Sequence, residues 1–161
     1  MPNYCSNWLM VRCQDNFKLN KFWVENRISE GDEENSETCL SFGRSVPMPK
    51  NNKDWYNWNI SNWGTKWDTV DAEIAEQVGL NDDLDKNLTE IHYYFDTAWG
   101  PAREWLRRIA EIYSDIEFEL EYSEGGMDFW GKLNYKDGGL VYEEEDQLSH
   151  HNWDKVDRDI M

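Results

Sequence analysis

Hydrophobic positions in the first half of the chain change their spacing twice, and each change predicts a new element. An apolar run at 8–13, which extends back to about Tyr4, predicts a strand. Apolar residues then recur at helical spacing over 17–28, after Asp15, a residue type that often caps a helix. A second apolar run at 38–42 predicts another strand. The predicted order is therefore strand, helix, strand.

The second half repeats this order and then adds two strands. Residues 90–96 predict a strand, and Pro101 stands where a proline commonly begins a helix. The buried stripe of this helix is predicted to be Trp105, Leu106, Ile109, Ile112 and Tyr113. Residues 116–122 alternate strictly between apolar and acidic side chains, the pattern of a strand with one buried face. Glycine-rich turns then lead into strands at 127–135 and 140–142.

The segment at about 46–87 interrupts this pattern. Its Pro-Met-Pro turn at 47–49 cannot continue a strand, because each proline removes a backbone donor. Residues 69–79 have helical spacing and end in a glycine, which is typical of a helix terminus. We therefore expect one domain at 1–142 that contains this insertion, followed by an acidic tail at 143–161.

Two strand–helix–strand halves predict a ferredoxin-like fold of the α+β class. In this split βαβ arrangement, an antiparallel sheet carries two helices on one face. A chain of 161 residues is long enough for one domain of ordinary size. We expect the Trp-rich insertion to be part of that domain.

The chain is strongly acidic, with 33 Asp and Glu residues against 16 Lys and Arg and a net charge of −17. Such a charge repels nucleic-acid phosphates and anionic lipids, and it attracts the basic surfaces that are commonest on nucleic-acid-binding proteins. A surplus of carboxylates also keeps a protein soluble without any binding role, and both interpretations stay open.

The cysteines predict a reducing environment. Cys5, Cys13 and Cys39 are odd in number and have no C-x-x-C spacing, so we expect small buried core residues and not disulfides or a zinc site. The first residues are not basic, and no apolar stretch reaches membrane-spanning length. We therefore expect a cytoplasmic protein without a signal peptide or a membrane span.

Several short blocks of the sequence are distinctive in their residues and spacing. They are MPNYCSN at 1–7, PMP at 47–49, WYNWN at 55–59, NWGTKW at 62–67, YFDTAW at 94–99 and FELEY at 118–122. Together they resemble the YubB ferredoxin-like family of phage and conjugative-plasmid proteins, from residue 1 to about 135. The resemblance implies a ferredoxin-like fold and a mobile genetic element inside a bacterium, but no reaction or catalytic residue.

Residues for catalysis or metal binding are few. The ligand types nearest one another are His150, His151, Asp146 and Asp154. Adjacent histidines, however, diverge on a strand or a helix and do not clamp one ion. Asp96 lies among aromatic residues, where a catalytic acid would have a raised pKa. Alternatively, it bonds the backbone where the strand meets the helix, or it anchors the Trp-rich loop through an indole N–H. We predict no enzyme, no metal and no cofactor.

Four of the ten tryptophans lie within residues 55–67. If exposed, these rings would form a platform that stacks bases or sugars or anchors a partner. If buried, they would cover one end of the sheet and pack against Trp99 and Phe95. Stacking on nucleic acid needs basic neighbours, which are few here, so we favour the structural role. The candidate aromatic residues are Trp55, Trp58, Trp63, Trp67 and Trp99.

The acidic strand suggests a partner surface. Glu117, Glu119 and Glu121 recur at every second position, about 6.6 Å apart along one face. This pitch is comparable to that of nucleic-acid phosphates, so the row would fit the groove of a nucleic-acid-binding protein. Further acidic residues that would extend it are Glu143, Glu144 and Glu145. The alternative is a solvated sheet face on which Lys132 neutralises one glutamate.

Two functions of different classes follow. The preferred one is a phage or mobile-element accessory protein that binds and inhibits a host protein with a basic surface. A CRISPR effector or another nucleic-acid-handling defence complex would be such a partner. The alternative is a small-ligand or nucleotide-binding module whose pocket wall is the Trp-rich loop. The first predicts binding that weakens with salt.

Overall fold

The computed structural model describes residues 3–29, 37–75 and 81–150. Its elements in chain order are β1 (Tyr4–Arg12), α1 (Asn16–Asn26), α2 (Phe42–Ser45), α3 (Trp55–Asn62), β2 (Val70–Ile74), β3 (Glu90–Ala98), α4 (Arg103–Ile112), β4 (Glu117–Glu124), β5 (Phe129–Lys136), β6 (Gly139–Gln147) and the 3₁₀ turn η1 (Leu148–His150). In this described part of the chain, no helix is long and apolar enough to cross a membrane.

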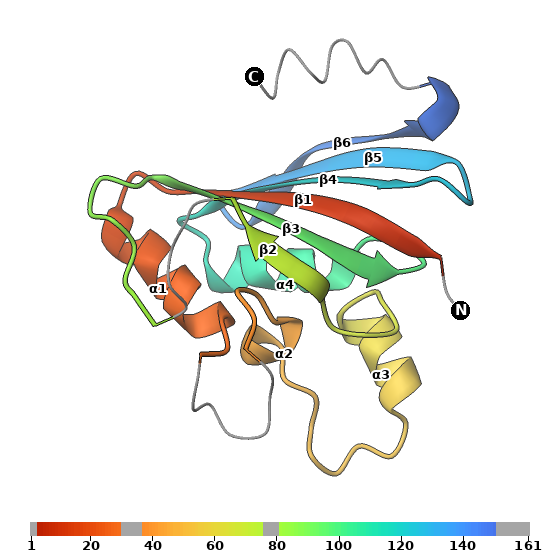
Figure 1. Ribbon diagram of the computed structural model, residues 1–161, viewed down its shortest axis with the longest axis horizontal. Coiled ribbons are helices and arrows are strands. Elements are labelled where there is room, and N and C mark those ends of the chain that lie inside the picture. The colour runs from red at the N-terminus through yellow and green to blue at the C-terminus, as the bar shows by residue number, and fades with distance from the viewer. Residues whose placement is uncertain (1–2, 30–36, 76–80, 151–161) are drawn as a thin grey trace.

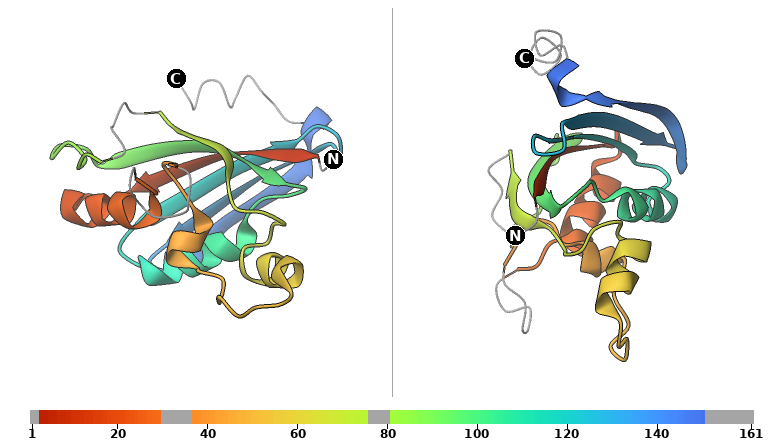
Figure 2. Two further views of the ribbon diagram at one scale, coloured as in Figure 1. Left: turned by 60° about the horizontal axis from the view of Figure 1, so that its bottom comes forward. Right: turned by 90° about the vertical axis from the view of Figure 1, so that its right-hand side faces the viewer.

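The strands form one antiparallel sheet in the order β2-β3-β1-β4-β5-β6. The first four have the order of a ferredoxin-like sheet, and β5 and β6 extend it beyond β4. Helices α1 to α4 lie together on one side of the sheet, as Figures 1 and 2 show. The prediction of an α+β, ferredoxin-like fold is therefore confirmed.

The second strand is not where the sequence predicted it. Residues 38–42 contribute only an isolated bridge from Thr38 to Ile28, and then enter α2. The strand that pairs with β3 is β2, at Val70–Ile74, inside the stretch predicted to be a helix at 69–79. A spacing of four fits one face of a helix and one face of a regular strand alike, so the sequence did not distinguish the two at Val70 and Ile74. In β2 a register shift sets Val70 opposite Asp96 and Ile74 opposite Tyr93, on different faces. Residues 76–79 lie outside the described part of the chain.

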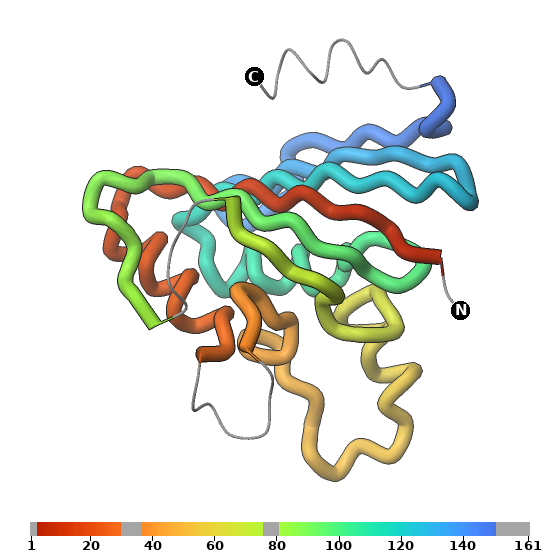
Figure 3. Tube along the Cα trace, in the orientation of Figure 1, coloured from red at the N-terminus to blue at the C-terminus, as the bar shows by residue number. Residues whose placement is uncertain are grey.

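The long excursion of the chain therefore has a different place in the order of elements from the one predicted. It connects α1 to β2 and includes α2 and α3, so it precedes the second strand of the sheet and does not follow it. Figure 3 traces it along the side of the sheet that carries the helices. The excursion therefore adds to the covered side of the sheet and leaves the other side alone.

The core lies between the sheet and the helices and is largely aromatic. Phe42 of α2 packs against Trp105 of α4 at a ring-centroid distance of 4.6 Å and against Phe95 of β3 at 5.8 Å. Phe22 of α1 packs against Phe118 of β4 at 5.4 Å. All five side chains are buried, so each helix of the βαβ plan and α2 contribute a ring to one core.

Helix α4 and the terminal strands differ from the predictions in detail. Of the predicted buried stripe of α4, three residues are buried and Tyr113 is half-buried against Phe22, but Ile112 is exposed. The second hairpin turn has positive φ at Asp137 and Gly138, as a two-residue turn between antiparallel strands requires. Residues 143–147 are not a tail: they pair with β5 as part of β6. Residues 151–161 of the predicted tail lie outside the described residues.

Candidate functional site: the open face of the sheet

The side of the sheet opposite α1 to α4 is called the open face here. Strand alternation sends Trp8 and Arg12 of β1, and His92 and Tyr94 of β3, to this face, while Leu9, Val11 and Tyr93 enter the core. The antiparallel register sets Trp8 opposite Tyr94, and Arg12 opposite Glu90. The two central strands thus bring aromatic and charged side chains together at the middle of the open face.

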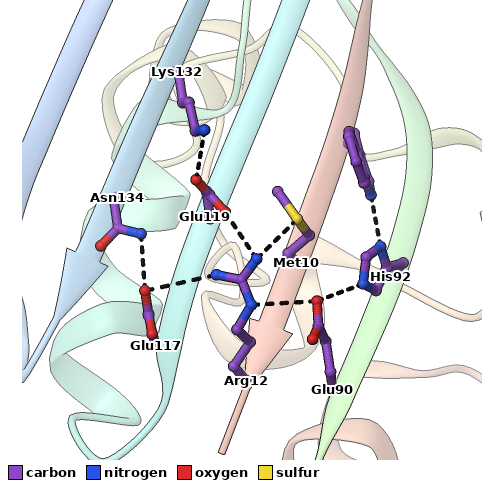
Figure 4. A network of polar contacts seen from close by, with 9 residues as sticks. Met10, Arg12, Glu90, His92, Glu117, Glu119, Lys132 and Asn134 are labelled. Carbon is purple, nitrogen blue, oxygen red and sulfur yellow. Dashed lines mark hydrogen bonds and ion pairs between the residues drawn. The ribbon is translucent and has the colours of Figure 1, made fainter. Parts of the chain in front are cut away.

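Arg12 is the centre of an ion-pair network on this face (Figure 4). Its guanidinium nitrogens lie 3.2 Å from the carboxylate of Glu90, 3.6 Å from that of Glu117 and 2.9 Å from that of Glu119. Burial lowers the pKa of Arg12, but the hydrogen bond and the charge of Glu119, with the charges of Glu90 and Glu117, raise it above its ordinary value. Arg12 is therefore a permanent cation that holds three strands together.

Glu119 is the most enclosed carboxylate of the network, with a side chain that is 12% exposed. It accepts from Arg12 and lies 2.9 Å from the ammonium of Lys132 on β5. Burial raises its pKa, but the hydrogen bonds from Lys132 and Arg12 outweigh burial and set the pKa below the ordinary value. The expectation that Lys132 neutralises one glutamate is confirmed at this position.

The predicted acidic row does share one face of β4, since Glu117, Glu119 and Glu121 alternate with buried residues. Its charge is partly balanced, because Glu117 also accepts a hydrogen bond of 3.0 Å from Asn134 in addition to its contact with Arg12. Glu121 lies in register with Lys132 on one side and with Trp8 on the other. The row is therefore an organised part of the sheet surface.

Sequence reasoning missed Arg12 and gave His92 no role. The indole N–H of Trp8 donates to Nδ1 of His92 over 2.9 Å, so Nε2 carries the proton of the neutral ring and donates to Glu90 over 2.6 Å. Trp8 also stacks on Tyr94 at 5.9 Å and 12°. The signal that could have found them is strand alternation. If residues 90–96 had been aligned with the first strand, Trp8, His92 and Tyr94 would have fallen on one face.

Beside this network the open face is hollowed. The hollow has a volume of about 140 Å³, and its lining includes Ser6, Trp8, Tyr94, Glu121, Ser123 and Trp130. Trp130 is buried at its wall, whereas Tyr94 is 41% exposed at its rim. The hollow thus combines aromatic rings with a carboxylate and two hydroxyls.

The three glutamates of the terminal strand do not all join this face. Glu144 is in register with Lys132 and so belongs to the open face. Glu143 and Glu145 point to the other side, where they lie 3.3 and 2.7 Å from Arg103 of α4. The six glutamates predicted as a partner surface are therefore divided between the two sides of the sheet.

The Trp-rich segment forms α3 and the turn after it. Asp54 caps the helix by accepting from the backbone N–H of Asn57. Trp63 is buried: its indole N–H donates to the carbonyl of Val46 over 2.8 Å, and its ring meets Trp58 edge-on at 5.5 Å. These contacts give the segment the structural role that the sequence analysis favoured.

The remaining tryptophans of that prediction are less enclosed. Trp55 is 45% exposed, and Trp67 is half-buried beneath the ammonium of Lys66 at 4.9 Å. Trp99 is 50% exposed, beyond the end of β3. Among the described ring contacts, Trp99 has none with α3, and Trp63 reaches Phe95 only through Phe42. The predicted packing of the segment against Trp99 is therefore wrong.

Groups for metal binding do not assemble in the described residues. No cluster of three His, Cys, Asp or Glu side chains there is arranged to hold a metal, and His151 and Asp154 lie outside them. Burial raises the pKa of Cys5 to about 12 and that of Cys39 to about 11, so both remain thiols at neutral pH. Burial and the charge of Asp71 raise the pKa of Asp96 above its ordinary value.

Comparison with known proteins agrees with this architecture. The family described as the ferredoxin-like domain in Api92-like protein matches residues 62–159. The crystal structure of the protein Api92 from Yersinia pseudotuberculosis is similar, with a TM-score of 0.63 and 9% sequence identity over 91% of this chain and 98% of that one. At this identity the likeness concerns the fold alone. Among curated proteins, no significant match is found.

Proposed function

This chain belongs to the family of ferredoxin-like domains found in Api92-like proteins, and we propose that it acts by binding a basic protein with its open face. The observation that carries the proposal is the contrast between the two sides of the sheet. One side is filled by helices, whereas the other presents organised charge and aromatic rings to solvent. A surface that is ordered but uncovered is suited to recognition.

The charge of the open face selects the partner. Within the described residues, carboxylates from β2, β3, β4 and β6 outnumber the basic side chains of this face, which are Arg12, Lys132 and Lys136. The network fixes the carboxylates of Glu90, Glu117 and Glu119 in place, so a partner pays little entropy to meet them. Such a surface attracts a basic partner and repels nucleic acid.

A finer form of the proposal concerns the biological setting. It is that the chain is an accessory protein of a phage or plasmid that inhibits a host nucleic-acid-binding protein, such as a CRISPR effector or another defence complex. The support is the resemblance to the YubB family together with the acidic row on β4. Binding without catalysis is part of the same proposal.

The small-ligand alternative built on the Trp-rich loop has weaker support. Its central ring, Trp63, is only 6% exposed, and the N–H of that ring is already bonded to Val46. A ligand would have to displace core contacts to use it.

The test is capture of partners from bacterial lysate with three baits. One is the wild-type chain, and one carries Glu117→Lys, Glu121→Lys and Glu144→Lys on the open face. The control bait carries Glu37→Lys, Glu104→Lys and Glu111→Lys, which change the net charge equally away from that face.

We expect a basic protein that the wild-type and control baits retain at low salt and release at high salt, and that the open-face bait does not retain. Thermal unfolding of all three baits checks that each is folded. Equal retention by all three, or retention by none, would contradict the proposal.

A further inference from the structure

We propose that the hollow on the open face is a recognition site for one arginine side chain of the partner protein. This inference rests on the proposed function and names the side chain through which the partner binds the open face. The lining supplies what a guanidinium needs: aromatic faces for its flat surface, a carboxylate for its N–H groups and hydroxyls at the edge.

The aromatic wall is pre-organised. Trp8 and Tyr94 have nearly parallel planes, and the indole of Trp8 is fixed by its hydrogen bond to His92. Trp130 forms another part of the wall and is 4% exposed. Fixed rings lose little freedom on binding, and a planar cation stacks on them better than a tetrahedral ammonium does.

The carboxylate that faces the hollow is Glu121, which lies between Trp8 on β1 and Lys132 on β5 in the sheet register. The ammonium of Lys132 is drawn toward Glu119, at 2.9 Å. Arg12 is likewise held by carboxylates on three strands. Within the described residues, the carboxylates of this face outnumber its basic side chains, which are Arg12, Lys132 and Lys136, so an incoming guanidinium meets a surplus of negative charge.

The size of the hollow limits what enters it. A volume of about 140 Å³ has room for a side-chain head group. A base with its sugar and phosphate is larger, and its phosphate would be repelled by the surrounding carboxylates. One arginine head group, supplied by a protein, fits both the volume and the charge.

The experiment uses the full chain and small probes, observed through the indole N–H signals in NMR spectra. The probe is N-acetyl-arginine amide, which represents an arginine within a peptide. The neutral isostere N-acetyl-citrulline amide tests the charge, and N-acetyl-lysine amide tests the shape of the cation. Free arginine tests whether the ligand is the amino acid itself or an arginine within a protein, because the carboxylate of the free amino acid would be repelled by this face.

We expect saturable shifts of the Trp8 and Trp130 signals with the arginine amide, no saturation with the citrulline amide, and weaker binding of the lysine amide and of free arginine. Glu121→Gln should weaken the arginine amide about tenfold, and Tyr94→Leu about threefold. The matched controls Glu111→Gln and Tyr56→Leu, on exposed helix positions of the covered side, should bind like the wild type.

Equal binding of the citrulline or lysine amide, or full binding by Glu121→Gln, would overturn the inference. An absence of any saturable shift would also overturn it. If lysate capture still depended on the open face in that case, the proposed binding function would stand without the arginine site. Failure of the capture alone would remove the proposed function.

Discussion

The two sides of the sheet place the same residue types in opposite environments. On the covered side, rings such as Trp105 and Phe118 are excluded from water and hold the helices in place. On the open side, Trp8 and Tyr94 stack on each other beside ion pairs, and one edge of the stack meets solvent. The difference shows that the surroundings of a ring, and not its chemistry, decide whether it is buried in the core or meets solvent.

The largest expected effect comes from removing one aromatic ring from each side of the sheet and comparing the two losses of stability. Trp105→Ala removes a side chain that is 1% exposed and should lower the free energy of unfolding by about 3–5 kcal/mol. Tyr94→Ala removes one that is 41% exposed and should cost less than about 1.5 kcal/mol. Urea denaturation measures both, with Trp105→Phe as a milder variant if the alanine variant does not fold. Equal losses would mean that the open-face stack belongs to the core.

A smaller effect is expected where the covered side approaches the backbone. A side chain on Gly131 of β5 would overlap the Tyr122 ring, whose hydroxyl bonds Arg103 and Glu145. Gly131→Ala should therefore destabilise the protein by about 1–3 kcal/mol in urea denaturation. Gly139→Ala is the matched control, since a Cβ there meets nothing within 4 Å, and it should leave stability nearly unchanged. A neutral Gly131→Ala would show that the Tyr122 ring can move aside.

The open-face network should contribute less, and in a pH-dependent way. Because Lys132 and Arg12 outweigh burial, the pKa of folded Glu119 lies below its ordinary value of 4.5. Its ionised form therefore stabilises the fold above pH 4.5, and this stabilisation is lost as the pH falls through the folded pKa. Glu119→Gln should cost about 1–2 kcal/mol at neutral pH.

Urea denaturation over a pH series measures this difference, which should shrink steadily on acidification. The exposed helix residue Glu111 supplies the control, since Glu111→Gln should alter stability only slightly at every pH. A cost of Glu119→Gln that stays constant with pH would mean that its charge does not stabilise the sheet.

The sequence predicted most of the covered side, because burial leaves a periodic signal. The alternation of 116–122 placed β4 and its buried face correctly, and the apolar spacing of α1 and α4 placed those helices. The signal was weakest where two periods coincide, at Val70 and Ile74, and there a strand was taken for a helix.

The open face could be predicted only in part, because its contacts join strands that are far apart in the sequence. The row of glutamates on β4 was visible as a local pattern. Its partner Arg12 lies more than a hundred residues away, and only the register of β1 against β4 brings it to Glu119. Two like residues in one strand, Glu143 and Glu144, also fall on opposite sides of the sheet, which a charge count does not reveal.

The smallest effect is expected at Asp96, whose negative charge on the open face destabilises the fold. Burial and repulsion by Asp71 outweigh the hydrogen bond from Ser6 and raise the pKa of Asp96 above its ordinary value of 3.8. A raised pKa means that the fold favours the protonated form, so the stability that this form provides is lost as the pH rises through the folded pKa. Asp96→Asn should therefore raise the melting temperature at neutral pH by about 1–3 °C, and this gain should vanish below about pH 3.8.

Asp71→Asn tests the same cause from the other side of the pair. It removes the repulsion without touching Asp96, and thermal unfolding should show a rise of the same sign. A fall in melting temperature for both variants would mean that the two carboxylates are held by favourable contacts. If both variants are more stable but weaken the captured partner, then the open face keeps this charge at the expense of stability, which is the pattern of a surface selected for binding.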